Sequence, residues 1–260
     1  MGSRDAGDVH SRLRARETHK GQGAELWCLG RALRWLLWHQ PSHRSPRGCG
    51  GELRDRSAKE DLTLPSQRRA LFSRVRQGLV RSLWIGITCA SWSRARRAPQ
   101  WSRMPHALRD DVDHIYGLPG LSERDQLRVT DGNDSLFFVA KLIRLCLRHN
   151  VMVVVENPGS SRLWIAPEMA SLIPRAASDN MVDYCAFGTE WRKRTRLVAW
   201  CQPLVRLPPL CSGKKGFCSF SGCKHVLLEG FTGGEFKTAA ASAYPVKMCR
   251  LLAPQLCSAV

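Results

Sequence analysis

Two reactive side chains follow apolar segments rich in β-branched residues. Cys89 comes shortly after the segment 82–87, and Glu156 comes directly after 151–155. The apolar character of both segments predicts buried strands, so each side chain should lie where a strand ends and a loop begins. A thiolate can add to an electron-poor heteroaromatic ring while a carboxylic acid protonates that ring. The pair therefore indicates a pocket for such a ring.

The segments around these two strands alternate between helical and extended patterns. Helices are predicted over 65–79, 134–148 and 238–252, and short apolar runs at 181–186 and 197–200 predict further strands. This alternation favours an α/β fold with a largely parallel sheet. In such folds ligands bind outside the carboxyl ends of the strands, so Cys89 and Glu156 should face one crevice.

The first 60 residues differ from the rest of the chain. They are rich in Arg, Gly, Ser and His, and apolar spacing predicts one amphipathic helix over 24–39. We interpret residues 1–60 as a basic, partly disordered N-terminal arm. Residues 61–260 are long enough to form one α/β domain with a substantial core.

Positive charge is the most distinctive bulk property. The chain has 260 residues, a hydrophobic fraction of 43%, which is ordinary for a globular protein, and a net charge of +18. Such a field attracts polyanions, and nucleic acid is the commonest of these. No segment reaches the ~18 uninterrupted apolar residues of a membrane-spanning helix. We therefore expect a nucleic-acid partner and no membrane partner.

The chain contains eleven cysteines. Residues 1–20 are polar and include acidic side chains, so no signal peptide is predicted. The cysteines are then expected to be reduced and free for packing, metal binding or catalysis. We predict an intracellular protein, and a nuclear one if its partner is DNA.

Four motifs, in the same order along the chain, resemble those of cytosine-5 DNA methyltransferases. Residues 88–93 (TCASWS) are similar to the family's Pro-Cys-Gln-x-Phe-Ser loop, and 156–158 (ENP) to its Glu-Asn-Val motif. Residues 187–196 (FGTEWRKRTR) resemble its Gln-x-Arg-x-Arg block, and 243–245 (AYP) its last motif. The resemblance covers roughly residues 61–253. It implies the Rossmann-like core of S-adenosylmethionine-dependent methyltransferases.

The resemblance also implies roles for individual residues. Cys89 would add to carbon 6 of a cytosine flipped out of the duplex, and Glu156 would protonate ring nitrogen 3. A basic side chain among Lys193, Arg194 and Arg196 would hold the carbonyl oxygen of the ring, and Arg194 and Arg196 are expected to be catalytic. Contacts to DNA are expected from Trp92, Ser93, Arg94, Arg96, Lys193, Lys214 and Lys215.

The methyl-donor site is not recognisable in the sequence. The family holds S-adenosylmethionine in a glycine-rich turn after its first strand, whereas the glycine cluster at 48–51 follows Pro-Arg and is typical of a linker. Asp61 is a candidate for the family's early acidic residue. The nucleotide-binding end of the fold is therefore predicted to be truncated or divergent.

A second group of ligand-forming residues lies in the expected target-recognition segment, at about 201–236. Cys211, Cys218, Cys223 and His225 could form a tetrahedral zinc site, although their spacing lacks a Cys-x-x-Cys pair. The same segment offers lysines for phosphates and two phenylalanines for base stacking, namely Lys214, Lys215, Lys224, Phe217 and Phe220.

Three functions are consistent with these patterns. The first is a cytosine-5 DNA methyltransferase-like enzyme, and the second is a non-catalytic relic that still binds nucleic acid. The third is a zinc-containing nucleic-acid-binding module. An apolar strand and glycine turn beside the strand that precedes Cys89 would favour the enzyme. An N-terminal arm that does not complete the sheet would favour the relic.

Overall fold

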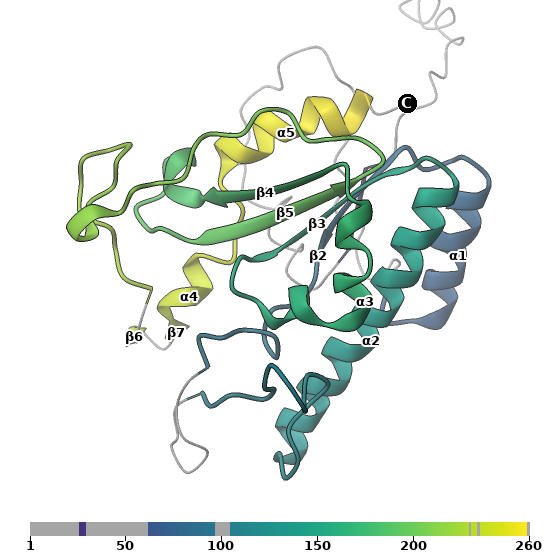
Figure 1. The fold of residues 1–260 in the computed structure, drawn as a ribbon, viewed down its shortest axis with the longest axis horizontal. Helices are drawn as coiled ribbons and strands as arrows, with labels where there is room; N and C mark the ends of the chain where they lie inside the picture. Colours follow the sequence, from purple (N-terminus) through teal and green to yellow (C-terminus); the bar gives the residue numbers. More distant parts are fainter. Residues whose placement is uncertain (1–25, 30–61, 97–104, 229, 233–234, 259–260) are drawn as a thin grey trace, which may run out of the picture.

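The computed structural model describes residues 26–29, 62–96, 105–228, 230–232 and 235–258 of the chain. These residues form a mixed α/β fold around one sheet, with helices on both of its faces (Figure 1). None of the described helices is long and apolar enough to cross a membrane.

The sheet has five strands in the order β1-β2-β3-β5-β4. β1 (Leu26–Leu29), β2 (Ser82–Gly86) and β3 (Met152–Pro158) pair in parallel. β5 (Arg194–Trp200) lies antiparallel between β3 and β4 (Ser178–Asp183). A separate short hairpin joins β6 (Phe231–Thr232) to β7 (Glu235–Phe236).

Alternating side chains of the strands supply two hydrophobic cores. Leu83 and Val153 point into a core that also contains buried residues of α1 (Pro65–Arg76), α2 (Glu123–Arg148) and α3 (Pro167–Ala170). Trp84 and Val154 point to the opposite face, where α5 (Val246–Ser258) covers the sheet. Because both faces are covered, the central strands contain continuous apolar runs, namely 83–85 of β2, 152–155 of β3 and 197–200 of β5.

Short helices complete the fold. Within the described ranges the 3₁₀ turns are η3 (Arg162–Ile165), η4 (Ile173–Arg175), η5 (Tyr184–Phe187) and η6 (Lys214–Gly216). A four-residue helix, α4 (Lys237–Ala240), follows the β6–β7 hairpin.

The strand and helix predictions are confirmed for most of the domain, with three corrections. The sheet is mixed rather than largely parallel, because β5 is antiparallel to both of its neighbours. α2 begins at Glu123 instead of 134, because the Ser122 hydroxyl caps it by accepting a hydrogen bond from the Asp125 amide at 3.3 Å. The C-terminal helix expected over 238–252 is divided, because α4 ends at Ala240 and α5 begins at Val246, directly after Pro245.

The predicted helix over 24–39 is wrong for the part that the structure describes. Leu26–Leu29 is a strand that pairs with β2 in parallel register, from Leu26 with Ser82 to Leu29 with Ile85. Helical spacing of the leucines was outweighed by the backbone groups along the free edge of β2, which gain hydrogen-bond partners in this pairing. The other residues of that prediction lie outside the described ranges.

Candidate functional site

The ends of β2 and β3 bring Cys89 and Glu156 to the same edge of the sheet. Gly86 is paired with Glu156 in the parallel register, and Cys89 follows three residues later. The buried side chain of Asn157 donates a hydrogen bond of 2.6 Å to the carbonyl of Ile87. This bond fixes the start of the loop that carries Cys89, residues 87–93 (the cysteine loop), relative to the end of β3.

Glu156 is buried, with 6% of its surface exposed, and its two carboxylate oxygens have different neighbours. Its Oε2 accepts a hydrogen bond from the Tyr244 hydroxyl at 2.8 Å. Its Oε1 lies 3.8 Å from Lys193 Nζ and has no hydrogen-bond partner among the described residues. A buried acceptor without a hydrogen-bond donor costs free energy, and a ligand that donates a hydrogen bond to it would remove this cost.

Tyr244 is the residue that orients Glu156. It packs edge-on against Trp84 of β2, with ring centroids 5.5 Å apart. Burial and the neighbouring Glu156 raise the pKa of Tyr244 well above its ordinary value, so its hydroxyl stays a proton donor to the carboxylate. Sequence reasoning named 243–245 as a motif but did not identify this contact.

Cys89 reaches solvent, yet protein surrounds it on its other sides. This desolvation raises the pKa of the thiol, the positive charge of Lys193 opposes the increase, and the negative charge of Glu156 adds to it. The cysteine of the free protein is therefore mostly a neutral thiol. A change in its surroundings would be needed to generate the nucleophilic thiolate.

Arg109, which the sequence did not indicate, holds the loop after Cys89 in place. It is fully buried and lies over the Trp92 ring, 3.5 Å from the guanidinium carbon to the centroid. It donates hydrogen bonds to Ser91 Oγ and to the carbonyl of Val129, both at 3.0 Å. It also donates to the Ile115 carbonyl at 2.8 Å and to Asn133 at 2.7 Å.

Trp92 does not have the exposed position that base stacking requires. Its side chain is fully buried beneath Arg109, so the expectation that Trp92 contacts nucleic acid is wrong. Ser93 is half-buried and its hydroxyl accepts the Ala95 amide at 3.1 Å. Arg94 pairs with Asp111, while Arg96 bonds Asp125 and the His106 carbonyl.

The basic residues of the arginine block make two kinds of contact. Arg194 makes two hydrogen bonds to the buried carboxylate of Asp183, at 2.9 and 3.1 Å, and Arg196 pairs with Asp179. Both arginines therefore link β5 to β4, and their role as catalytic cations stays a prediction. The cation of this block that approaches Glu156 is Lys193, which also lies 4.8 Å above the Tyr184 ring. Asp61 lies outside the described residues.

A cluster of cysteine and histidine side chains lies just beyond the C-terminal end of β4. The ligand atoms of Cys185, Cys211, Cys218 and His225 all lie within 4.8 Å of one another. Cys223, which the sequence placed in the predicted zinc site, is exposed and does not belong to the cluster. Cys185 takes its place because η5 brings the segment after β4 beneath the 211–225 loop. Sequence spacing could not show this, since Cys185 lies outside the loop.

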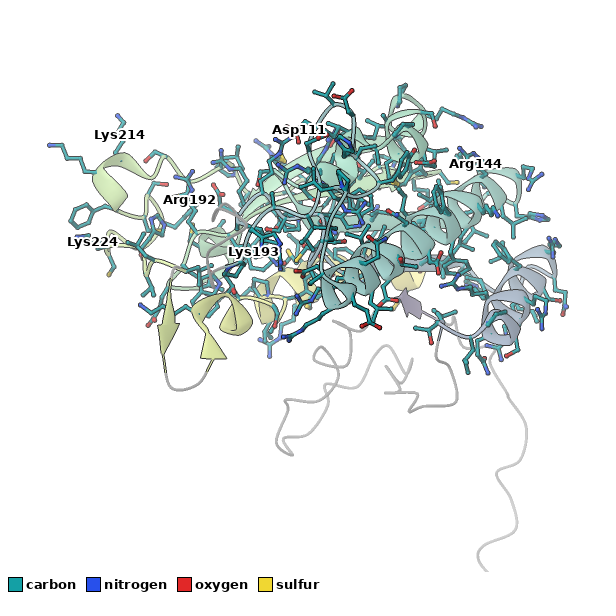
Figure 2. The ribbon with its side chains drawn as sticks, turned by 90° about the horizontal axis from the view of Figure 1, so that it is seen from below. Asp111, Arg144, Arg192, Lys193, Lys214 and Lys224 are labelled. Carbon is teal, nitrogen blue, oxygen red and sulfur yellow. The ribbon has the colours of Figure 1, made fainter. Side chains whose placement is uncertain are left out.

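The outer surface of that loop is basic and aromatic. Figure 2 shows Lys214 and Lys224 at one end of the molecule, on the opposite side from Arg144. Lys215 is also exposed, and the side chains of Phe217 and Phe220 are 50% and 43% exposed. We call the exposed basic and aromatic side chains of the loop the loop surface, namely Lys214, Lys215, Phe217, Phe220 and Lys224.

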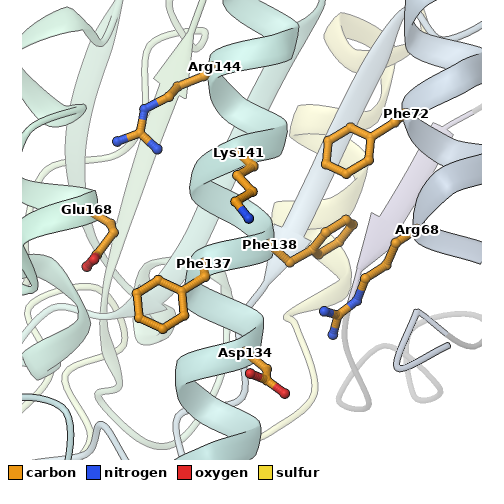
Figure 3. Close-up of a pocket in the computed structure, with 8 residues that line it drawn as sticks. All are labelled: Arg68, Phe72, Asp134, Phe137, Phe138, Lys141, Arg144 and Glu168. Atoms are coloured by element: carbon orange, nitrogen blue, oxygen red, sulfur yellow. The ribbon is translucent and has the colours of Figure 1, made fainter. Parts of the chain in front are cut away.

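A groove of about 520 Å³ lies on the outer side of α2 (Figure 3). Its walls combine aromatic, basic and acidic side chains of α1, α2 and α3, namely Arg68, Phe72, Asp134, Phe137, Phe138, Lys141, Arg144 and Glu168. It shares no residue with Cys89, Glu156 or Lys193.

Comparisons with known proteins add no homologue to this description. A scan against protein-family models found no match to the chain, and searches of curated proteins and of solved structures also found none.

Proposed function

We propose that this protein is a cytosine-5 DNA methyltransferase-like protein whose pocket binds a flipped-out cytosine. The observation that carries the proposal is the convergence of Cys89, Glu156 and Lys193 at one edge of the sheet, with Oε1 of the buried Glu156 lacking a hydrogen-bond partner among the described residues. These are the nucleophile, the ring acid and the cation that the motif resemblance implies. Each comes from a different segment of the chain.

The proposed chemistry balances with these residues. The Cys89 thiol passes its proton to the Glu156 carboxylate as the sulfur forms a bond to carbon 6. Glu156 delivers that proton to ring nitrogen 3, and the electrons of the carbon 5–carbon 6 double bond move into the ring. Lys193 would stabilise the negative charge that develops on the carbonyl oxygen. Carbon 5 becomes nucleophilic as a result. Tyr244 holds Glu156 in the required orientation throughout.

β1 supports the enzyme over the relic. It is an apolar strand paired with β2, and Gly30 follows it directly in the sequence. S-adenosylmethionine would supply a methyl group to carbon 5. Asp61 and the glycines at 48–51 lie outside the described residues, so no step is derived through this donor.

A base analogue tests the pocket without a methyl donor. In a duplex with random flanks, 2-pyrimidinone replaces cytosine, because its more electrophilic carbon 6 can form an adduct without methyl transfer. We expect a covalent complex on a denaturing gel that Cys89→Ser abolishes and that Glu156→Gln slows by about a hundredfold or more. Cys223→Ser changes an exposed cysteine outside this pocket and should leave the adduct intact.

Two further outcomes separate the alternatives. If the wild-type protein binds the duplex but never forms the adduct, Cys89 is not the nucleophile and the non-catalytic relic is correct. A duplex with 5-fluorocytosine should trap the enzyme only when S-adenosylmethionine is added, because the fluorine blocks release after methyl transfer. Trapping by 2-pyrimidinone alone would indicate a pocket that activates the base without methylating it.

The second candidate function is a zinc-containing nucleic-acid-binding module. The observation in its favour is the Cys3His cluster beneath the loop surface. In this case zinc removal would abolish DNA binding, whereas Cys89→Ser and Glu156→Gln would leave both binding and its salt dependence unchanged. Titration of fluorescent DNA in the presence and absence of a zinc chelator distinguishes the two functions.

A further inference from the structure

The segment between β5 and the β6–β7 hairpin has very little hydrophobic core. Across 201–228 the buried residues are Cys211 and Cys218, and with Cys185 they form a core cluster made of cysteines alone. Phe217, Phe220, Val226 and Leu227 are all exposed. Leu204, Val205 and Leu207 are partly buried against the core beneath α5. Across 208–228, however, burial of apolar surface contributes little, and another source of stability is required.

The geometry of the cluster matches a tetrahedral zinc centre. Zinc–sulfur bonds of about 2.3 Å place neighbouring ligand atoms roughly 3.8 Å apart, and Cys211 Sγ lies 3.7 Å from His225 Nε2. His225 Nδ1 lies 3.1 Å from the Gly216 carbonyl. If Nδ1 donates its hydrogen to this carbonyl, Nε2 is left free to bind a metal.

Backbone amides surround the sulfurs in the way that metal-bound thiolates require. The Ser219 amide donates to Cys211 Sγ at 3.3 Å, and the Phe220 amide donates to Cys218 Sγ at 3.4 Å. Such bonds satisfy the negative charge that a thiolate keeps on metal binding. We propose that Cys185, Cys211, Cys218 and His225 bind one zinc ion.

The ion would be structural. Four protein ligands complete a tetrahedron and leave no position for water or substrate, and three sulfurs with one imidazole nitrogen favour zinc over magnesium or calcium. Its function is to join two parts of the chain, because Cys185 belongs to η5 while the other three ligands belong to the loop.

This join lies next to Lys193. The Tyr184 amide, one residue before Cys185, donates to the Lys193 carbonyl at 3.1 Å. The Val226 amide, one residue after His225, donates to the Glu190 carbonyl at 2.9 Å. The zinc would therefore fix the 184–193 connection that presents Lys193 to Glu156. This consequence rests on the proposed function, whereas the metal site does not.

Metal analysis with two matched cysteine variants tests the ligand set. After purification under reducing conditions with added zinc, we expect one zinc per chain in the wild type and in Cys223→Ser. Cys185→Ser should have a large loss of zinc. An equal zinc content in the two variants, or a loss confined to Cys223→Ser, would overturn the assignment of Cys185.

Cobalt titration of the wild-type protein makes the test independent of whether Cys185→Ser folds. Three thiolates and one imidazole around Co²⁺ should give intense tetrahedral absorption bands in the visible region together with a sulfur-to-metal charge-transfer band, and zinc should displace both. If the metal-stripped wild-type chain gives no such spectrum and takes up no zinc, the site does not exist. Cys89→Ser should keep the full spectrum, so failure of the base pocket and failure of the metal site are distinguishable.

Discussion

At the residue scale, the side chains of the candidate pocket influence one another through hydrogen bonds and charge. Tyr244 donates to one oxygen of Glu156, and Lys193 approaches the other. The same Lys193 and Glu156 act in opposite directions on the thiol of Cys89, whose pKa is raised mainly by burial. A bound base that contacts Glu156 and Lys193 would therefore also change the reactivity of the cysteine.

Thiol alkylation across the neutral-to-alkaline range measures this electrostatic coupling. The alkylation rate of Cys89 should rise with pH to a midpoint above that of an ordinary thiol, because burial disfavours the thiolate. Glu156→Gln removes a negative charge and should lower the midpoint, whereas Lys193→Met removes a positive charge and should raise it. Peptide-resolved mass spectrometry follows Cys89 with exposed Cys223 as the internal reference. Movement of both variants in the same direction would contradict the proposed geometry.

At the element scale, α2 shapes the loop that carries Cys89. Gly132 lies within the helix, where Ser91, Trp92 and Arg109 pack against its backbone. A Cβ atom at position 132 would come within 2.4 Å of Ser91 Oγ and 2.8 Å of Arg109 Nη2. A glycine in the middle of a helix lowers helical propensity, but here it permits the close approach of the cysteine loop.

Gly132→Ala separates local propensity from tertiary packing. Alanine should favour the isolated helix by about 1 kcal/mol. In the folded protein, the clash with the cysteine loop should outweigh this gain, so the substitution should lower stability. We expect a net loss of about 1–3 kcal/mol in the free energy of unfolding, measured by urea denaturation. Asp131→Ala, at an exposed neighbouring position of α2, should change stability by less than about 0.5 kcal/mol. A stabilised Gly132→Ala protein would show that the loop does not pack as described.

At the scale of the whole molecule, charge and fold together define the expected DNA contacts. The chain carries a net charge of +18. The loop surface is at one end of the molecule, while Lys141 and Arg144 line the groove on α2 (Figures 2 and 3). Phosphate contacts release counterions, so their number can be read from the salt dependence of binding.

Under the proposed function, salt titration of DNA binding would identify the side of the molecule that contacts phosphates. Replacing Lys214, Lys215 and Lys224 by Gln should reduce the slope of log affinity against log salt by about 0.9 for each phosphate that is no longer neutralised. The same replacement of Lys141, Arg144 and Arg148 on α2 removes an equal charge and should affect binding much less. An equal reduction of slope in both variants would indicate attraction to overall charge without a defined role for the loop. Fluorescence anisotropy at several salt concentrations provides the measurement.

The sequence by itself determined the elements that depend on local patterns of burial. Apolar runs located β2, β3 and β5, and helical spacing located α1 and the second half of α2. These elements placed Cys89 beyond β2 and Glu156 near the carboxyl end of β3, although β3 continues to Pro158 and so contains Glu156. Such patterns are visible in sequence because side-chain periodicity records which faces are covered.

Only the tertiary structure decided which distant residues meet. Glu156 and Tyr244 are 88 positions apart, Cys185 joins three ligands of a later loop, and Arg109 reaches Ser91 from an irregular segment. Leu26–Leu29 became a strand because β2 offered an edge to pair with. These contacts follow from the path of the whole chain, which brings together groups whose local sequences do not specify one another. The positions of Cys89 and Glu156 were therefore predictable, but the contacts of Tyr244 and Lys193 with Glu156 and the place of Cys185 in the cluster were not.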